Sequence, residues 1–119
     1  MPEQRFVIDH IAKPVIMARP DPMWAADMRA LAQRPNVFCK LSGLSTLPRL
    51  GGAAVEPYLD LVLAAFGAAR CMVGSDWPVS TLGGDYGQTI GLLRQWAAAL
   101  SADEQAQLMG GSCTAFYRL

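Results

Sequence analysis

Histidine is almost missing from this chain, since His10 is the only one among 119 residues. An excess of charge is missing too: ten Lys and Arg balance ten Asp and Glu, and the basic residues are scattered, which argues against nucleic acid as a partner. The longest apolar stretch, residues 58–69, contains Asp60 and is much shorter than the ~20 residues that a membrane span needs. No apolar signal segment follows residues 1–5, so we expect a cytoplasmic protein with no membrane partner.

Cysteine is scarce, and its spacing excludes the usual cysteine-based frameworks. Cys39, Cys71 and Cys113 are an odd number at wide intervals, which fits neither a set of disulfides nor a Cys-x-x-Cys metal site. Cys39 and Cys71 lie inside apolar runs, where a free cysteine behaves as a small hydrophobic residue. We therefore predict three reduced thiols, two of them in the core.

The composition, 52% hydrophobic and 17% charged, is that of one folded domain. Its apolar pattern predicts alternating strands and helices, in the order strand 5–9, helix 23–33, strand 37–41, helix 55–66, strand 71–73 and helix 86–100. Trp24, Met28, Leu31 and Ala32 should share the buried face of the first helix. Gly67 is the expected C-cap of the second.

The C-terminal region predicts one more short helix. Ser101 and Glu104 have the spacing of a capping box, which would open a helix reaching about residue 109. Gly110 and Gly111 are expected to end it, before a final turn at residues 112–117.

Alternation of strands and helices predicts an α/β fold. The strands are almost continuously apolar, which is typical of parallel strands that are covered on both faces or closed into a barrel. Three strands cannot close a barrel, and a complete eight-stranded one takes about 250 residues. The chain would then be a little under half of a barrel.

Two of the predicted strands end at residues that can act on a metal or a proton. The strand at residues 5–9 leads into His10, and the strand at 71–73 leads through Gly74 and Ser75 to Asp76. In α/β proteins the ligand crevice lies at the carboxyl ends of the strands, which favours an active site here. Two simpler interpretations remain, because a lone histidine is often a packing residue and Asp76 is well suited to cap the following turn.

Two serines are candidate nucleophiles, but their surroundings argue against a serine hydrolase. Ser42 and Ser75 both lack the Gly-x-Ser-x-Gly elbow, and His10 precedes both of them in the chain.

Four segments, in this order, resemble one known family: Val7-Ile-Asp-His-Ile-Ala-Lys-Pro14, Asn36-Val-Phe-Cys-Lys-Leu-Ser-Gly-Leu44, Val73-Gly-Ser-Asp-Trp-Pro-Val79 and Ala115-Phe-Tyr-Arg-Leu119. Together they are similar to the C-terminal portion of the amidohydrolase-related lactonases. That family includes fuconolactonase-like and rhamnonolactonase-like enzymes and the 2-pyrone-4,6-dicarboxylate lactonases. The resemblance implies a TIM-type (β/α)8 barrel, of which this chain would supply about strands six to eight with their helices.

The resemblance also implies roles for single residues. His10 would bind substrate or a metal, and Asp76 would take a proton from the attacking water and pass it to the leaving oxygen. The same two residues would be ligands of one divalent metal ion such as zinc, although a metal-independent reaction is the alternative. Lys13 and Lys40 could hold a carboxylate or hydroxyl groups of the substrate, but Lys40 lies within a strand and could point to the helices instead. Trp77 could stack on a sugar ring or close the barrel mouth, and Tyr86, which begins the last long helix, has the same two uses.

The chain departs from the family pattern because its single histidine cannot form the His-x-His pair of the first strand. We therefore expect a truncated gene product or one piece of a split gene. In the first hypothesis it belongs to a hydrolase of a sugar lactone or related cyclic ester, completed by an N-terminal portion or a partner half-barrel. In the second it is an incomplete fragment that acts only by association, with itself or a partner. A third interpretation is a metal-dependent decarboxylase of carboxylic acids from the same superfamily.

Overall fold

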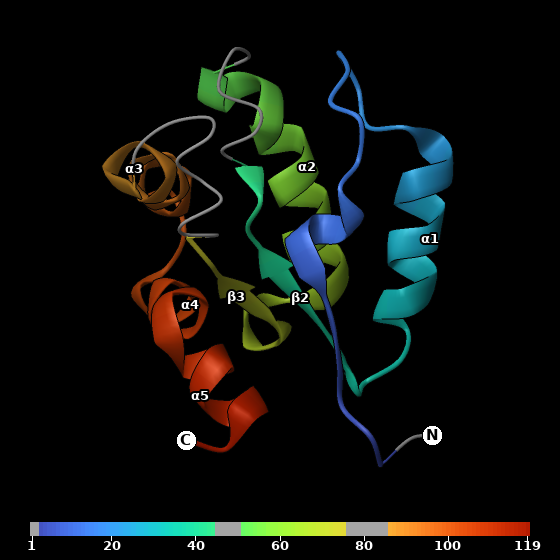
Figure 1. Cartoon of the computed structure of the whole chain (residues 1–119), viewed down its shortest axis with the longest axis vertical. Coiled ribbons are helices and arrows are strands. Elements are labelled where there is room, and N and C mark those ends of the chain that lie inside the picture. Colours follow the sequence, from blue (N-terminus) through green and yellow to red (C-terminus); the bar gives the residue numbers. More distant parts are fainter. Residues whose placement is uncertain (1–2, 45–50, 76–85) are drawn as a thin grey trace.

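A parallel three-stranded sheet forms the centre of the molecule (Figure 1). The structure is a computed structural model that describes residues 3–44, 51–75 and 86–119. Strands β1 (Phe6–Ile8), β2 (Val37–Leu41) and β3 (Cys71–Val73) lie in the order β1-β2-β3. The predicted parallel arrangement of all three strands is confirmed.

Helices surround this sheet. The long ones are α1 (Pro22–Ala32), α2 (Gly51–Phe66) and α3 (Tyr86–Ala97), and the short C-terminal ones are α4 (Ala102–Ala106) and α5 (Ser112–Tyr117). Short 3-10 segments follow β1, as η1 (Asp9–Ala12), and precede β3, as η3 (Ala68–Arg70). Figure 1 shows α1 and α2 on one side of the strands and α4 and α5 on the other. Among the described residues, no helix is both long and apolar enough to cross a membrane.

Local sequence signals explain where several helices begin and end. The Asp21 side chain caps α1, because its Oδ1 accepts a hydrogen bond from the backbone N–H of Met23 at 3.0 Å. The predicted capping box is confirmed, with Ser101 and Glu104 each accepting a hydrogen bond from the other's backbone N–H. Gly67 follows α2 with a φ of 76°, which few other residues adopt, so its predicted capping position is also confirmed.

The structure differs from the sequence-based expectation at several boundaries. Strand β1 is shorter than predicted because Asp9 already belongs to η1. Helix α2 begins at Gly51, within the segment that we expected to be a loop, and α3 ends at Ala97 instead of residue 100.

The expectation that Gly110 and Gly111 break the C-terminal helix holds in part, because the backbone of Gly110 is non-helical but a second helix follows it directly. The chain continues through a π-helical turn, η5 (Gln107–Gly111), with one kink at Gly110, and enters α5 where a simple turn was predicted. Tertiary contacts explain the continuation, because Leu108 is buried in the core and the Ser112 hydroxyl donates a 2.6 Å hydrogen bond to the carbonyl of Ala68. These contacts outweigh the weak helix propensity of two glycines.

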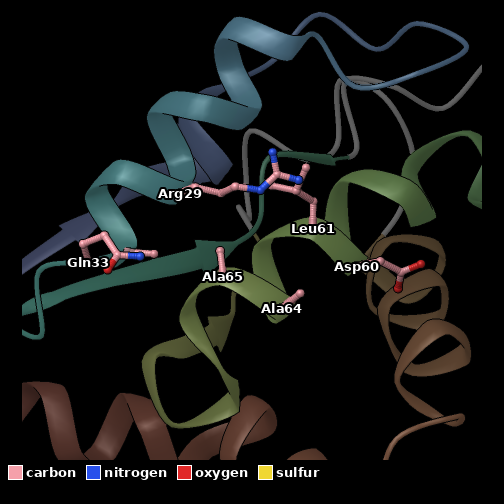
Figure 2. Close-up of a pocket in the computed structure, with 7 residues that line it drawn as sticks. Arg29, Gln33, Asp60, Leu61, Ala64 and Ala65 are labelled. Atoms are coloured by element: carbon pink, nitrogen blue, oxygen red, sulfur yellow. The ribbon is translucent and has the colours of Figure 1, made fainter.

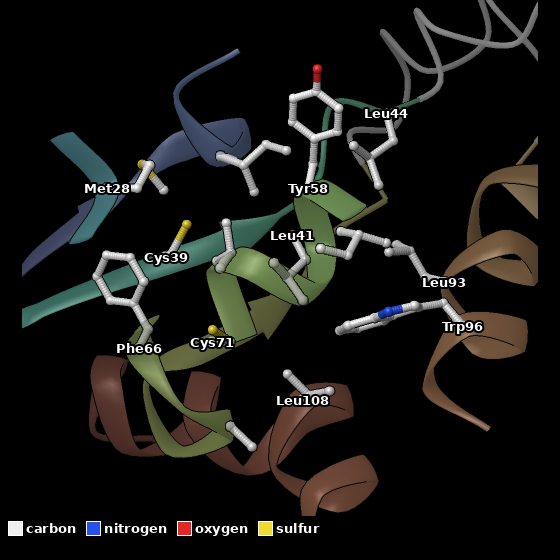
Figure 3. Packing of buried hydrophobic residues seen from close by; sticks show 14 of the residues in the cluster. Met28, Cys39, Leu41, Leu44, Tyr58, Phe66, Cys71, Leu93, Trp96 and Leu108 are labelled. Atoms are coloured by element: carbon white, nitrogen blue, oxygen red, sulfur yellow. The ribbon is translucent and has the colours of Figure 1, made fainter. Parts of the chain in front are cut away.

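The main core lies between the sheet and helices α1, α2 and α3 (Figure 3). Alternate residues of β2 face it, namely the buried Val37, Cys39 and Leu41. The other face of β2 is covered by α5, where the rings of Phe38 and Phe116 meet edge to face at 5.0 Å. Both faces of the central strand are therefore covered, as its apolar sequence predicts.

Two details of the predicted core were tested. Met28 and Ala32 are buried and Trp24 is half-buried, but Leu31 is 42% exposed, so its predicted place on the buried face is wrong. Trp24, Met28 and Ala32 are spaced four residues apart and lie on one face of α1, whereas Leu31 comes one residue before Ala32 and lies beside that face. All three cysteines are free, as predicted, and Cys39 and Cys71 are fully buried.

Candidate active site

The carboxyl ends of the three strands meet in one polar cavity. β1 is followed by Asp9 and His10, β2 by Ser42 and Gly43, and β3 by Gly74. A cavity of about 370 Å³ opens there. Its lining combines polar residues at or near the strand ends, apolar residues of β3 and side chains of α5, namely Asp9, His10, Lys40, Ser42, Met72, Val73, Gly74, Cys113 and Tyr117. This is the edge at which parallel α/β sheets bind their ligands.

The His10 ring is the centre of this cluster. Its Nδ1 lies 2.8 Å from the hydroxyl oxygen of Ser42, which is a full-strength hydrogen bond. Its Nε2 lies 3.5 Å from Oδ2 of Asp9, an electrostatic contact longer than a normal hydrogen bond. About one-fifth of the His10 side chain remains exposed, so the ring can reach a molecule in the cavity.

A left-handed turn places His10 at the mouth of the cavity. His10, Ile11, Ala12 and Lys13 all have positive φ values, between 45° and 59°. This conformation costs roughly 1–2 kcal/mol for each L-residue, so surrounding contacts must maintain it. Ile11 is 1% exposed, and its carbonyl accepts a 3.0 Å hydrogen bond from Nε1 of Trp24. Burial of Ile11 and the Trp24 hydrogen bond thus hold a strained backbone beside the candidate site.

Two glycines make room for the His10–Ser42 pair. A Cβ on Gly43 would lie 2.7 Å from Cβ and Cγ of His10, closer than real atoms approach. A Cβ on Gly74 would lie 3.0 Å from Cβ of Ser42. The sequence Ser42-Gly43 and the glycine after β3 are therefore required for the tight packing around the imidazole.

Lys40 points into the cavity, which decides between the two orientations that the sequence left open. Its Nζ lies 3.5 Å from Oδ1 of Asp9. Partial burial of Lys40 acts to lower its pKa, but a hydrogen bond with Tyr117 and attraction to Asp9 outweigh burial, so the pKa is raised above that of an ordinary lysine. The cavity therefore holds a stable positive charge beside a carboxylate.

The described residues fit part of a metal site. Nε2 of His10 and Oδ2 of Asp9 are 3.5 Å apart, and two ligands of a tetrahedral zinc ion are separated by roughly 3.4 Å given the usual Zn–N and Zn–O lengths. Across residues 3–44, 51–75 and 86–119 there is no group of three His, Cys, Asp or Glu side chains that could hold a metal. Asp76, the other predicted ligand, lies outside the described residues.

The remaining predicted site residues have different fates. Lys13 is exposed at the end of the left-handed turn and does not line this cavity, and its substrate-binding role stays a prediction. Trp77, like Asp76, lies outside the described residues, so its role also stays a prediction.

Sequence reasoning missed Asp9 and Tyr117 as residues of the candidate site. Asp9 could have been found from its place beside His10 at the strand end, whereas nothing in the sequence placed Tyr117 beside Lys40.

Comparison with known proteins decides the family. The sequence pattern of the amidohydrolase family matches residues 1–119. The chain belongs to this family. It is 44% identical, over 99% of its length, to an L-fucono-1,5-lactonase of Burkholderia ambifaria, of which it covers 43%.

Solved amidohydrolase structures have the same fold as this chain. A zinc-bound amidohydrolase of Burkholderia multivorans is similar over 98% of the chain, with a TM-score of 0.88 and 41% identity, and the chain covers 44% of it. A putative 2-pyrone-4,6-dicarboxylic acid hydrolase of Pseudomonas putida is similar over 96% of the chain, with a TM-score of 0.78 and 25% identity, and 43% of it is covered. The amidohydrolase chain thus spans less than half the length of its relatives, and the prediction of a partial TIM-type barrel is confirmed.

A larger cavity of about 510 Å³ lies elsewhere on this amidohydrolase chain, between α1 and α2 (Figure 2). Arg29, Gln33, Asp60 and the neighbouring Leu61 are among its lining residues. None of the strand-end residues lines it. Size alone is therefore a poor guide here, and the smaller cavity at the strand ends is the candidate active site.

Proposed function

We propose that this chain supplies part of the active site of a hydrolase that opens a sugar lactone or a related cyclic ester. The observation that carries the proposal is the cluster of His10, Ser42, Asp9 and Lys40 at the strand ends. It occurs in a chain that is 44% identical to an L-fucono-1,5-lactonase. Because the chain spans less than half of that relative, catalysis requires the remaining strands from another part of the protein or from another chain.

Lactone hydrolysis needs a base for water and a positive group near the carbonyl. In our proposal Asp76 removes a proton from the attacking water and later transfers it to the ring oxygen that leaves. His10 binds the substrate or a divalent metal through Nε2. If a divalent ion such as zinc is bound, it would polarise the carbonyl and acidify the water, with His10 and Asp9 or Asp76 among its ligands.

Lys40 has the charge and position to hold the substrate. Its ammonium lies inside the cavity, and Asp9 and Tyr117 keep it protonated. A protonated amine at this place can donate hydrogen bonds to lactone hydroxyl groups or pair with a carboxylate. We propose the same kind of contact, from outside the cavity lining, for Lys13, and ring stacking for Trp77.

A chimera tests the catalytic proposal. This chain replaces the matching segment of the B. ambifaria lactonase, and hydrolysis of L-fucono-1,5-lactone is measured with and without added zinc. Asp76→Asn should lower kcat by about 100-fold or more, the usual contribution of a general base. Asp27→Asn, on the exposed side of α1, is the control and should leave kcat unchanged. Full activity of the Asp76→Asn chimera would contradict the proposal.

A second candidate function is association without catalysis. In the sheet order β1-β2-β3, the outer edges of β1 and β3 have no strand partner among the described residues. Phe6, on β1, is 48% exposed, and Met17 is 51% exposed. Exposed strand edges with apolar side chains favour association. Size-exclusion chromatography with light scattering on the isolated chain tests this: a discrete inactive oligomer would favour association alone, and an active peak would favour the hydrolase.

A further inference from the structure

The sheet has an outer and an inner face, and α5 lies against the inner one (Figure 1). On the outer face Cys39 and its register partner Cys71 enter the core beneath the long helices. Because side chains alternate along a strand, Phe38 and Lys40 point to the opposite face, as does Met72, the partner of Lys40 on β3. In a (β/α)8 barrel the helices surround the strands, so this opposite face is the one that the barrel encloses.

Contacts at the beginnings of two strands hold α5 on this inner face. The rings of Phe38 and Phe116 meet edge to face at 5.0 Å. The guanidinium of Arg5, which precedes β1, donates hydrogen bonds to the carbonyl oxygens of Ala115 and Phe116, the second at 3.0 Å. The last turn of α5 is therefore tied to the amino ends of β1 and β2, inside the region that a complete barrel would enclose.

Two side chains of α5 reach the candidate active site from this anchored position. Cys113 and Tyr117 are four residues apart, so they share one face of the helix. Both line the same cavity of about 370 Å³ as His10 and Ser42. Tyr117 also forms a hydrogen bond with Lys40, the residue that we propose holds the substrate. The cavity thus has catalytic groups at the carboxyl ends of the strands and a helix that approaches it from their amino ends.

We propose that α5 forms the floor of the substrate cavity, where Cys113 and Tyr117 contact the bound lactone and limit how deeply it can enter. The tyrosine ring offers a large apolar surface with one polar group, and a cysteine thiol is a small, mostly apolar contact. Both suit the carbon skeleton of a sugar lactone better than its reacting carbonyl. Cys113 and Tyr117 are therefore specificity-determining residues. The lactone as ligand rests on the proposed function, whereas the position of α5 does not.

The thiol of Cys113 reports on occupancy of this floor. In the chimera with the B. ambifaria lactonase, its reaction with dithionitrobenzoate is followed with and without L-fuconate, the product of lactone hydrolysis. The kinetic phase that is missing from the Cys113→Ser chimera belongs to Cys113. L-fuconate at about ten times its inhibition constant should slow this phase about tenfold, because only the unoccupied fraction reacts.

A displaced thiol is the matched control for labelling. Ala30 is exposed on α1, which packs on the outer face of the sheet. In a chimera that combines Cys113→Ser with Ala30→Cys, the new thiol should react at the same rate with and without L-fuconate. A general effect of the ligand on the reagent or on the fold would slow both thiols.

Steady-state kinetics test the same floor without a label. Tyr117→Ala should raise KM for L-fucono-1,5-lactone by about 10-fold or more and change kcat little, since the lost contact is made equally in the ground and transition states. Tyr117 is 47% exposed, so its replacement should leave the chain folded. Tyr117→Phe keeps the ring and should restore most of the loss. Thr114→Ala, at an exposed position of α5, should leave KM unchanged.

The outcomes separate this floor from the proposed function. In an active chimera that L-fuconate inhibits competitively, unchanged labelling of Cys113 or an unchanged KM in Tyr117→Ala would overturn the floor and leave the hydrolase proposal intact. A chimera that neither hydrolyses the lactone nor binds L-fuconate would overturn both.

Discussion

Gly43 lies directly against the His10 side chain, so closely that a Cβ at position 43 would be 2.7 Å from Cβ and Cγ of His10. Its φ of 70° is also one that favours glycine. We expect Gly43→Ala to destabilise the chain by about 2–4 kcal/mol, the sum of backbone strain and overpacking. It should also shift the imidazole ring resonances of His10, measured by NMR beside urea unfolding.

Gly67→Ala separates the two effects of that substitution. Gly67 has a similar φ of 76°, but no atom lies within 4 Å of a Cβ added there. The variant should lose stability through backbone strain alone, about 1–3 kcal/mol, and keep the His10 resonances. Unchanged His10 resonances in Gly43→Ala would show that this glycine does not position the ring.

The interaction of Lys40 with Asp9 and Tyr117 predicts a specific pH dependence. The pKa of Lys40 is raised in the folded chain, so its stabilising contribution is complete below the ordinary lysine pKa of about 10.4 and is lost as the pH rises through the folded value. Lys40→Met should therefore be less stable at pH 8, by at most about 1 kcal/mol because both partners are partly exposed. The difference should shrink above about pH 10.4 in urea unfolding titrations. A difference that stays constant to higher pH would contradict this account.

The element order and the parallel sheet could be predicted from the sequence because the signals are local. β2 was predicted at its observed bounds, since residues 37–41 are apolar except for Lys40 and lie between turn-forming neighbours. The C-terminal region was predicted less well. A second helix follows the kink at Gly110 because Leu108 and Ser112 have tertiary partners, and local helix propensity does not include such contacts.

The candidate site was predictable only in part. The strand-end position of His10 pointed to the cavity, but Ser42, which contacts its Nδ1 there, comes from a different strand end. Ser42 was considered only as a nucleophile, because a sequence cannot reveal that its hydroxyl meets Nδ1. The left-handed backbone at Ile11 had no signal at all, since a β-branched residue disfavours positive φ.

Thiol reactivity should separate the three cysteines. Burial raises the pKa of the Cys71 thiol to about 12, although Arg70 partly opposes this, and burial likewise raises the pKa of Cys39. Cys113 is only partly buried, at the cavity. One thiol should react quickly with a disulfide reagent such as dithionitrobenzoate, and the other two only as fast as the chain unfolds. Cys113→Ser should abolish the fast phase. Rapid reaction of all three thiols in the folded chain would contradict the burial of Cys39 and Cys71.

Trp24 should stabilise the strained turn that presents His10. Trp24→Phe removes the hydrogen bond from Nε1 to the carbonyl of buried Ile11, and we expect a loss of about 1–3 kcal/mol because that carbonyl then lacks its donor. Trp96→Phe is the matched control: it also removes an indole N–H, but its acceptor is the carboxylate of Asp60, an exposed residue that water can satisfy. Trp96 is 7% exposed, so Trp96→Phe loses stability through core packing, and the two variants are distinguished by NMR: only Trp24→Phe should shift the His10 resonances. Unchanged His10 resonances in Trp24→Phe would mean that packing of η1 alone maintains the left-handed backbone.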